Sequence, residues 1–222
     1  MNYILIIMKY YKSILTVVLS AIFTILVYHV VILIFGSNKD CDHILKYNYN
    51  CIAEAELKYF ETKSKLVAEI QTYMTSVAPT TNVMAFELVD LCDKYGIDIK
   101  FVLAQAEIES CFATKGLAAK TRSMFNLGAF DNYTYDRIHH RYKYQHPNAS
   151  IEPYLKLLNE KYLVDKTEYD LMLNYVDKHN TRYASDEDYE KKLSNKYRCI
   201  KNNTSIDSLQ SLMTYYAINC NR

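Results

Sequence analysis

The hydrophobic and polar positions divide the chain into an apolar N-terminal run and a series of helix-like segments. Residues 14–36 form a run of 23 residues without Asp, Glu, Lys or Arg. This meets the requirement of roughly 20 apolar residues for crossing the hydrocarbon core of a bilayer. No small-x-small cleavage site follows the run, so it predicts a retained transmembrane signal-anchor rather than a cleaved signal peptide. Lys9 and Lys12 precede it, and the positive-inside rule places residues 1–36 as a cytoplasmic N-terminus and single membrane span, with the rest of the chain on the extracytoplasmic side of the cytoplasmic membrane.

Beyond this run, apolar residues recur at helical spacing. Residues 37–80 predict a helical stalk or linker, although the amphipathic helix within them also suits a part of the following domain. Ala, Pro, Thr and Asn at 78–82 mark a boundary, and residues 81–222 are predicted to form one domain. Its predicted helices are 83–95, 98–112, 150–162, 167–179, 186–197 and 204–218, with a helical turn at 117–120 and a small hairpin or ordered loop at 131–145.

Residues 98–112 stand out because almost the whole circumference of the predicted helix is apolar, which indicates burial. Asp98 is its predicted N-cap, directly after the Gly96 that ends the preceding helix. Lys100 and Glu107 form a narrow polar strip on the opposite side, and Glu107 is therefore expected to be solvated. Glu109 lies instead at the edge of an apolar face.

A buried carboxyl group has a raised pKa because burial disfavours its charged form. If Glu109 stays protonated near neutral pH, it can donate a proton to a glycosidic oxygen. The alternative is a structural Glu109 in a seam between helices, satisfied by a backbone group or a lysine.

Composition narrows the functional classes. Lys and Arg number 26 against 25 Asp and Glu, so the net charge of +1 does not favour broad binding to nucleic acid. Four glycines and three prolines disfavour turn-dense β folds and dinucleotide-binding loops. The 22 tyrosines, without any Trp, suit either contact with a glycan polymer or a bias in codon usage.

The six cysteines do not have the spacing of a zinc site, so we predict no metal or other cofactor. If the domain lies outside the cytoplasm, proximity along the chain favours two disulfides, Cys41–Cys51 and Cys199–Cys220. Cys92 and Cys111 lie in predicted helices and are expected to be buried free thiols.

Four blocks of sequence occur in a recognisable order: AQAEIESCFATKGLA at 104–118, SMFNLGAF at 123–130, YQHPNASIEPYLKLL at 144–158 and RYASDEDYEKKL at 182–193. Together they resemble the glucosaminidase domain of bacterial and phage peptidoglycan hydrolases, glycoside hydrolase family 73 and its relatives. That family has A-Q-A-x-x-E-S, an N-L-F-G-like loop, S-I-x-x-Y before a leucine-rich helix, and Y-A-T-D-x-x-Y-x-x-K-L. The resemblance covers about residues 83–197.

The resemblance implies a mainly α, lysozyme-like domain with a cleft between helical lobes and a small loop or hairpin lobe. It implies an endo-β-N-acetylglucosaminidase that cleaves peptidoglycan strands, with Glu109 as the general acid and Tyr183 lining the cleft. Asp131, just beyond the N-L-G segment, is the best-placed candidate for a second catalytic group, although a loop-capping role suits it equally. The expected substrate-binding residues are Ser110, Phe112, Phe125, Asn126 and Tyr154.

The chain also departs from the family pattern. The family often has Trp-Gly after E-S, where this chain has Phe112-Ala113. The second carboxylate has no clear counterpart, and Asp136 and Glu152 are further candidates. Retaining, inverting and substrate-assisted hydrolysis therefore remain open, as does lytic transglycosylation. A non-catalytic glycan-binding or structural module of a phage or cell-envelope assembly is the alternative from another functional class.

Overall fold

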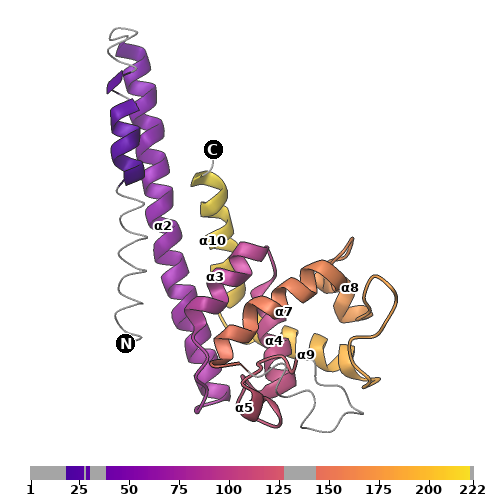
Figure 1. The fold of residues 1–222 in the computed structure, drawn as a ribbon. Coiled ribbons are helices and arrows are strands. Elements are labelled where there is room, and N and C mark those ends of the chain that lie inside the picture. The colour runs from indigo at the N-terminus through magenta and orange to yellow at the C-terminus, as the bar shows by residue number, and fades with distance from the viewer. Residues whose placement is uncertain (1–18, 28, 31–38, 128–143, 221–222) are drawn as a thin grey trace. The chain divides into compact units, whose positions relative to one another are not determined.

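Figure 1 shows the computed structural model, which describes residues 19–27, 29–30, 39–127 and 144–220. The chain divides into two compact units, Met1–Glu54 and Ala55–Arg222. In the first unit, residues 19–27 and 29–30 are helical. Within the described ranges, no helix is both long and apolar enough to span a membrane. Much of the predicted anchor lies outside these ranges, so the anchor stays a prediction.

Helix α2 (Lys39–Val77) begins in the first unit and continues into the second. Leu66, Ile70 and Met74 follow one another at intervals of four residues and are completely buried. This spacing puts them on one face of the helix, which packs into the core of the second unit. The second unit thus begins at Ala55, within the segment predicted as a stalk, and a loop at 78–84 then leads into the next helix.

Helices α3 (Ala85–Tyr95) and α4 (Ile99–Ser110) lie within the predicted helices at 83–95 and 98–112, although α3 begins and α4 ends two residues inside those ranges. Gly96 ends α3 in the left-handed region, at a φ of 65°. Asp98 caps α4, since its side chain accepts a hydrogen bond from the Lys100 amide at 2.9 Å. The middle of α4 is fully buried, from Phe101 to Ala106. The prediction of a largely buried central helix is confirmed.

The polar strip of α4 is covered by neighbouring helices, and the prediction that Glu107 is solvated is wrong. Lys100 is only 4% exposed, and its Nζ lies 2.9 Å from Asp98 Oδ1 and 2.8 Å from an oxygen of Asp207 in α10 (Ile206–Cys220). Glu107 Oε1 lies 2.5 Å from the Nζ of Lys196 in α9 (Tyr189–Asn203), and Glu107 Oε2 accepts a hydrogen bond from the Tyr73 hydroxyl of α2. Neighbouring helices thus cover the polar strip and supply opposite charges.

The segment after the undescribed residues forms one helical stretch, composed of η1 (Pro147–Ser150), α7 (Ile151–Leu157) and the π-helical turn η2 (Leu158–Tyr162). Its buried side chains join the same core as α4. The short helix α5 (Ala118–Thr121) precedes the gap. The predicted hairpin or loop at 131–145 lies, apart from its last two residues, outside the described ranges. In the described ranges the fold is mainly helical, as predicted, and contains no β-strand longer than a single bridge.

Helix α8 (Glu168–Leu173) is shorter than the predicted helix at 167–179. Thr167 and Asp170 form a capping box at its start, but the chain leaves the helix after Leu173. The Asp177 carboxylate then accepts hydrogen bonds from the backbone amides of His179 and Thr181, both at 2.8 Å. Aspartate side chains compete in this way with helical backbone hydrogen bonds. The result is a tight turn closed by an antiparallel bridge between Val176 and Arg182.

The two predicted disulfides are not formed, because Cys51 and Cys199 are free thiols. Cys41 and Cys51 both lie in α2, and ten residues of α-helix separate two Cα atoms by roughly 15 Å. A disulfide requires Cα atoms about 4.4–6.8 Å apart. Cys92 and Cys111 are buried free thiols, as expected.

Candidate active site

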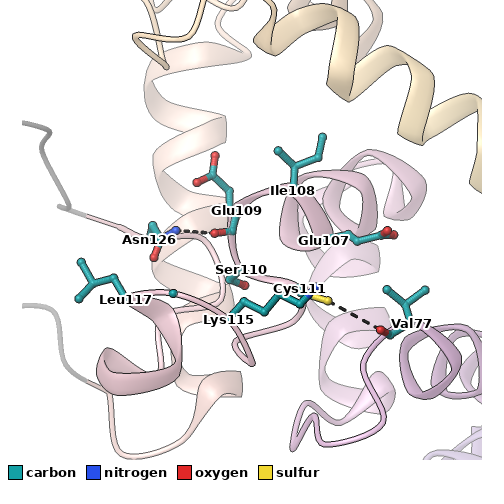
Figure 2. A pocket seen from close by; sticks show the side chains of 10 residues that line it. Val77, Glu107, Ile108, Glu109, Ser110, Cys111, Lys115, Leu117 and Asn126 are labelled. Carbon is teal, nitrogen blue, oxygen red and sulfur yellow. Dashed lines mark hydrogen bonds between the residues drawn. The ribbon is translucent and has the colours of Figure 1, made fainter.

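Glu109 lies in the last turn of α4 and lines a pocket of about 410 Å³ (Figure 2). The walls come from the end of α4, the loop that follows it, and two more distant positions. The lining residues are Val77, Glu107, Ile108, Glu109, Ser110, Cys111, Lys115, Gly116, Leu117 and Asn126. The pocket therefore brings residues of the first two sequence blocks together around Glu109.

The carboxyl group of Glu109 is held by a tyrosine from α9. The Tyr189 hydroxyl donates a hydrogen bond to Glu109 Oε1 at 2.6 Å, and Tyr189 itself is 5% exposed. Burial raises the pKa of Glu109 above its ordinary value of 4.5, while the side chains of Tyr189 and Asn126 act in the opposite direction. Since burial prevails, the protonated form of Glu109 persists to a higher pH than that of an exposed glutamate.

Hydrogen bonds tie the end of α4 to the N-L-G block. Ser110 Oγ donates to the Met124 carbonyl at 2.6 Å and accepts from the Ala113 amide at 2.8 Å. Asn126 Nδ2 donates to the backbone carbonyl of Glu109 at 2.6 Å (Figure 2). These contacts satisfy groups left free at a helix C-terminus and hold the backbone on both sides of the acid.

The backbone turns sharply just after Ser110. Cys111, Phe112 and Ala113 have φ values of 49°, 55° and 62°, so three consecutive residues other than glycine occupy the left-handed region. Such residues each store strain, and runs of them persist only when their surroundings hold them in place. Here the Cys111 amide donates to the Glu107 carbonyl at 2.9 Å, and the Thr81 hydroxyl donates to the Phe112 carbonyl at 2.9 Å.

Four aromatic rings, those of Tyr162, Tyr175, Tyr183 and Tyr189, form a cluster beside Glu109 that we call the tyrosine cluster. Tyr183 stacks on Tyr175 with 4.4 Å between ring centroids, and its centroid lies 5.5 Å from that of Tyr189. The tight turn after α8 sets this stack, because the Tyr183 amide donates to the Tyr175 carbonyl at 2.9 Å. Burial, and after it the charge of Glu109, raises the pKa of Tyr183 well above its ordinary value. Tyr183 is therefore a neutral phenol close to the candidate acid.

Three of the expected substrate-binding aromatics lie in the core. Phe112, Phe125 and Tyr154 are at most 1% exposed, and none of them lines the pocket. The rings of Phe125 and Tyr154 stack with centroids 3.6 Å apart, and the Tyr154 hydroxyl donates to Gln105 Oε1. Ser110 and Asn126 do line the pocket. The roles of all five in substrate binding stay predictions.

The candidates for a second carboxylate do not meet Glu109 in the described part of the chain. Asp131 and Asp136 lie outside it. Glu152 is ion-paired with Lys94 at 2.8 Å and does not line the pocket. Glu107 does line it, which its place on the polar strip did not suggest, but Figure 2 shows its side chain pointing in a different direction from that of Glu109.

Sequence reasoning missed two residues of this site. Tyr189 was visible as the second tyrosine of the RYASDEDYEKKL block, but nothing local indicated that it would reach Glu109. Gln105 belongs to the A-Q-A motif, is fully buried, and accepts hydrogen bonds from Tyr154 and from Tyr175, the latter at 3.0 Å. It thereby links α4 to the tyrosine cluster.

No group of three or more His, Cys, Asp or Glu side chains within the described ranges is placed to hold a metal ion. What the site does offer is a partly buried carboxyl group that lines a pocket and accepts a hydrogen bond from a tyrosine hydroxyl. This arrangement suits protonation of a leaving-group oxygen.

Comparison with protein families finds one match. The glucosaminidase family model, described as mannosyl-glycoprotein endo-beta-N-acetylglucosaminidase, matches residues 86–202. No curated protein and no solved structure matches the chain. The matched range is more than half of the chain and contains Glu109, Tyr183 and Tyr189, and it confirms the resemblance read from the four sequence blocks. The chain therefore belongs to the glucosaminidase family of glycan hydrolases.

Proposed function

We propose that this protein is an endo-β-N-acetylglucosaminidase that cleaves the glycan strands of peptidoglycan, with Glu109 as its general acid. The observation that carries the proposal is the position and burial of the Glu109 carboxyl group. Its carboxyl group lines a pocket, is largely buried, and has a pKa raised by that burial. A protonated carboxyl group in a pocket is what protonation of a glycosidic oxygen requires.

Tyr189 has a specific part in this mechanism. Its hydroxyl donates to Glu109 Oε1 at 2.6 Å, and this hydrogen bond becomes stronger once Glu109 has given up its proton and carries a charge. An interaction that strengthens as the reaction proceeds stabilises the transition state more than the bound substrate. Tyr183, beside Tyr189, is our candidate for contact with the sugar that develops positive charge.

The charges around the pocket bear on the second half of the reaction. Glu107 is the other carboxylate among the described lining residues, and it is engaged by Lys196 and Tyr73. It is therefore badly suited to activate water or attack the sugar. We therefore propose Asp131 as the second group, and the alternative is attack by the substrate itself, through its N-acetyl group or, in a lytic transglycosylase, through a hydroxyl.

Replacement of Glu109 by Gln tests the assignment of the acid. The amide has nearly the same shape but cannot donate a proton as an acid, so we expect muropeptide release to fall by about 100-fold or more. Glu187→Gln, which changes an exposed glutamate that does not line the pocket, is the matched comparison and should keep the activity. Unchanged release by Glu109→Gln would refute the proposal, and retention of strands by a folded wild-type protein without turnover would support a binding module instead.

The products distinguish the two enzymatic readings. Mass spectrometry of the released fragments should find reducing ends at N-acetylglucosamine if the protein is a hydrolase. Fragments that end in 1,6-anhydro sugars would identify a lytic transglycosylase on the same polymer.

We further propose that residues 14–36 anchor the protein in the cytoplasmic membrane with the glucosaminidase domain on the cell-wall side. The support is the 23-residue run without charged residues and the two lysines before it. A reporter fused after Arg222 should be active only outside the cytoplasm. A cytoplasmic reporter, or a mature protein that begins near Asn38, would overturn the anchor.

A further inference from the structure

Among the described lining residues, the charged side chains are those of Glu107, Glu109 and Lys115. Glu107 is offset by Lys196, whose Nζ lies 2.5 Å from it. Glu109 is protonated over a wider pH range than an exposed glutamate because it is buried. Glu107 is thus already paired, and burial disfavours the charged form of Glu109, so an unpaired cation in the wall is available to an anionic ligand.

Lys115 is the cation among the described lining residues. It is exposed, and no carboxylate in the described ranges forms an ion pair with it. Its backbone is well held, since its amide donates to the Ser110 carbonyl at 2.9 Å and Gly116 follows at a φ of 62°. The lysine thus stands at a defined position one loop away from the acid.

The described part of the wall around Lys115 holds no charge of opposite sign. The lining residues from Ser110 to Asn126 include Lys115 and no Asp or Glu. A wall of this kind attracts anionic groups and does nothing for neutral ones.

We propose that Lys115 forms a subsite for a carboxylate carried by the substrate, on a peptide or lactyl substituent of the glycan. This inference rests on the proposed function and narrows its substrate class. Glycan strands with carboxylate-bearing substituents would be preferred over neutral glycans, such as oligomers of N-acetylglucosamine or the mannosyl glycans in the family's description. A lysine suits this role because its ammonium group attracts a carboxylate without demanding one fixed geometry.

The test uses one polymer in two forms: peptidoglycan strands with free carboxylates, and the same strands after their carboxylates have been converted to neutral amides. For the full-length protein with Lys115→Gln, we expect KM on the carboxylate form to rise about three- to five-fold at low ionic strength, the upper part of the range for an exposed ion pair. kcat should stay unchanged, because Lys115 takes no part in proton transfer. The effect should shrink in high salt, which screens the interaction.

Two variants serve as controls. Lys115→Arg keeps the charge and should retain the low KM. Lys191→Gln removes an exposed lysine of α9 that does not line the pocket and should change nothing. The subsite would be overturned if wild type and Lys115→Gln had the same KM on the carboxylate form. It would also be overturned if Lys115→Gln raised KM on the amidated form as much as on the carboxylate form.

A binding measurement separates this inference from the proposed function. This measurement uses the Glu109→Gln variant, so that the strands are bound but not cleaved. In that variant, the added change Lys115→Gln should weaken binding of the carboxylate strands about three- to five-fold and leave binding of the amidated strands unchanged. If wild type cleaves neither polymer but this carboxylate-dependent difference remains, the proposed activity fails and the subsite stands. If both forms bind equally with and without Lys115, the subsite fails whatever the activity.

Discussion

Glu109 and Tyr189 are 80 residues apart in the sequence and meet through one short hydrogen bond. That bond and the burial of the carboxyl group act on the pKa of Glu109 in opposite directions. Burial makes the acid available at higher pH, while the phenol favours its ionised form and so eases loss of the proton. For the proposed role of Glu109 as general acid, the balance between these two effects would set the pH range of activity.

Tyr189→Phe is expected to shift this balance in a defined direction. Removal of the hydroxyl removes an interaction that favours ionised Glu109, so the pKa of Glu109 rises further. A general acid is active in its protonated form, and the alkaline limb of the pH profile of kcat/KM should therefore move to higher pH.

The matched control for this change is Tyr169→Phe, which removes the hydroxyl of a tyrosine in α8 that is 65% exposed. Its pH profile should coincide with that of wild type. An alkaline limb that stays in place, or moves to lower pH, in Tyr189→Phe would show that the hydrogen bond does not govern the ionisation of Glu109.

At the scale of elements, the turn after α4, next to Glu109, holds its residues in a backbone conformation that they disfavour. The Cys111–Phe112–Ala113 turn carries three left-handed residues without a glycine. The family pattern that this segment resembles often has Trp-Gly at these positions, and the φ of 62° at Ala113 explains why glycine suits the second of them. The strain is held in place by Ser110 and Thr81, whose side chains bind the turn.

Ala113→Gly is expected to stabilise the domain. A residue with a Cβ atom in the left-handed region is strained by about 1–2 kcal/mol, and the extra freedom of glycine in the unfolded chain offsets part of the gain. We expect a net increase of about 0.5–1 kcal/mol in the free energy of unfolding, or roughly 2–4 °C in Tm at the upper end.

The comparison variant is Ala119→Gly, in the helical and exposed part of α5. There, glycine should lower stability by about 0.5–1 kcal/mol, since no strain is relieved. Thermal unfolding followed by circular dichroism measures both variants. A decrease in Tm for Ala113→Gly as large as that for Ala119→Gly would contradict the strain interpretation.

At the scale of the whole molecule, the second half of α2 belongs to the glucosaminidase unit although it precedes the range matched by the family. Leu66, Ile70 and Met74 are fully buried in the shared core, and Tyr73 from the same helix binds Glu107. The helix therefore supports the element that carries the acid.

Truncation tests this contribution. A chain of residues 55–222 should be soluble and unfold cooperatively, whereas 81–222 should not fold. Each large apolar side chain contributes about 1.5–3 kcal/mol when fully buried. Loss of three of them removes an amount comparable with the whole stability of a domain, about 5–15 kcal/mol. A cooperative transition at the same Tm in both fragments would show that α2 is only a linker.

The sequence alone was enough to predict most helices and the identity of the candidate acid. Apolar periodicity, the Asp98 cap and the terminating Gly96 depend on residues a few positions apart, and they placed α3 and α4 correctly. The four sequence blocks indicated Glu109 and the family, because each block is a motif of residues that are close together in the chain. The local pattern predicted too long a helix at α8. There the side chain of Asp177 accepts backbone hydrogen bonds, and the chain forms a turn in place of the last helical turns.

The tertiary structure decided which side chains meet. Whether Lys100 and Glu107 face water depends on other helices. Asp207 of α10 contacts Lys100, and Tyr73 of α2 and Lys196 of α9 contact Glu107. Tyr189 reaches Glu109 only because α9 packs along α4, and this same packing produces the burial that raises the acid's pKa. A residue's backbone conformation follows largely from its neighbours in the chain, whereas its solvation and charge state follow from the elements that fold against it.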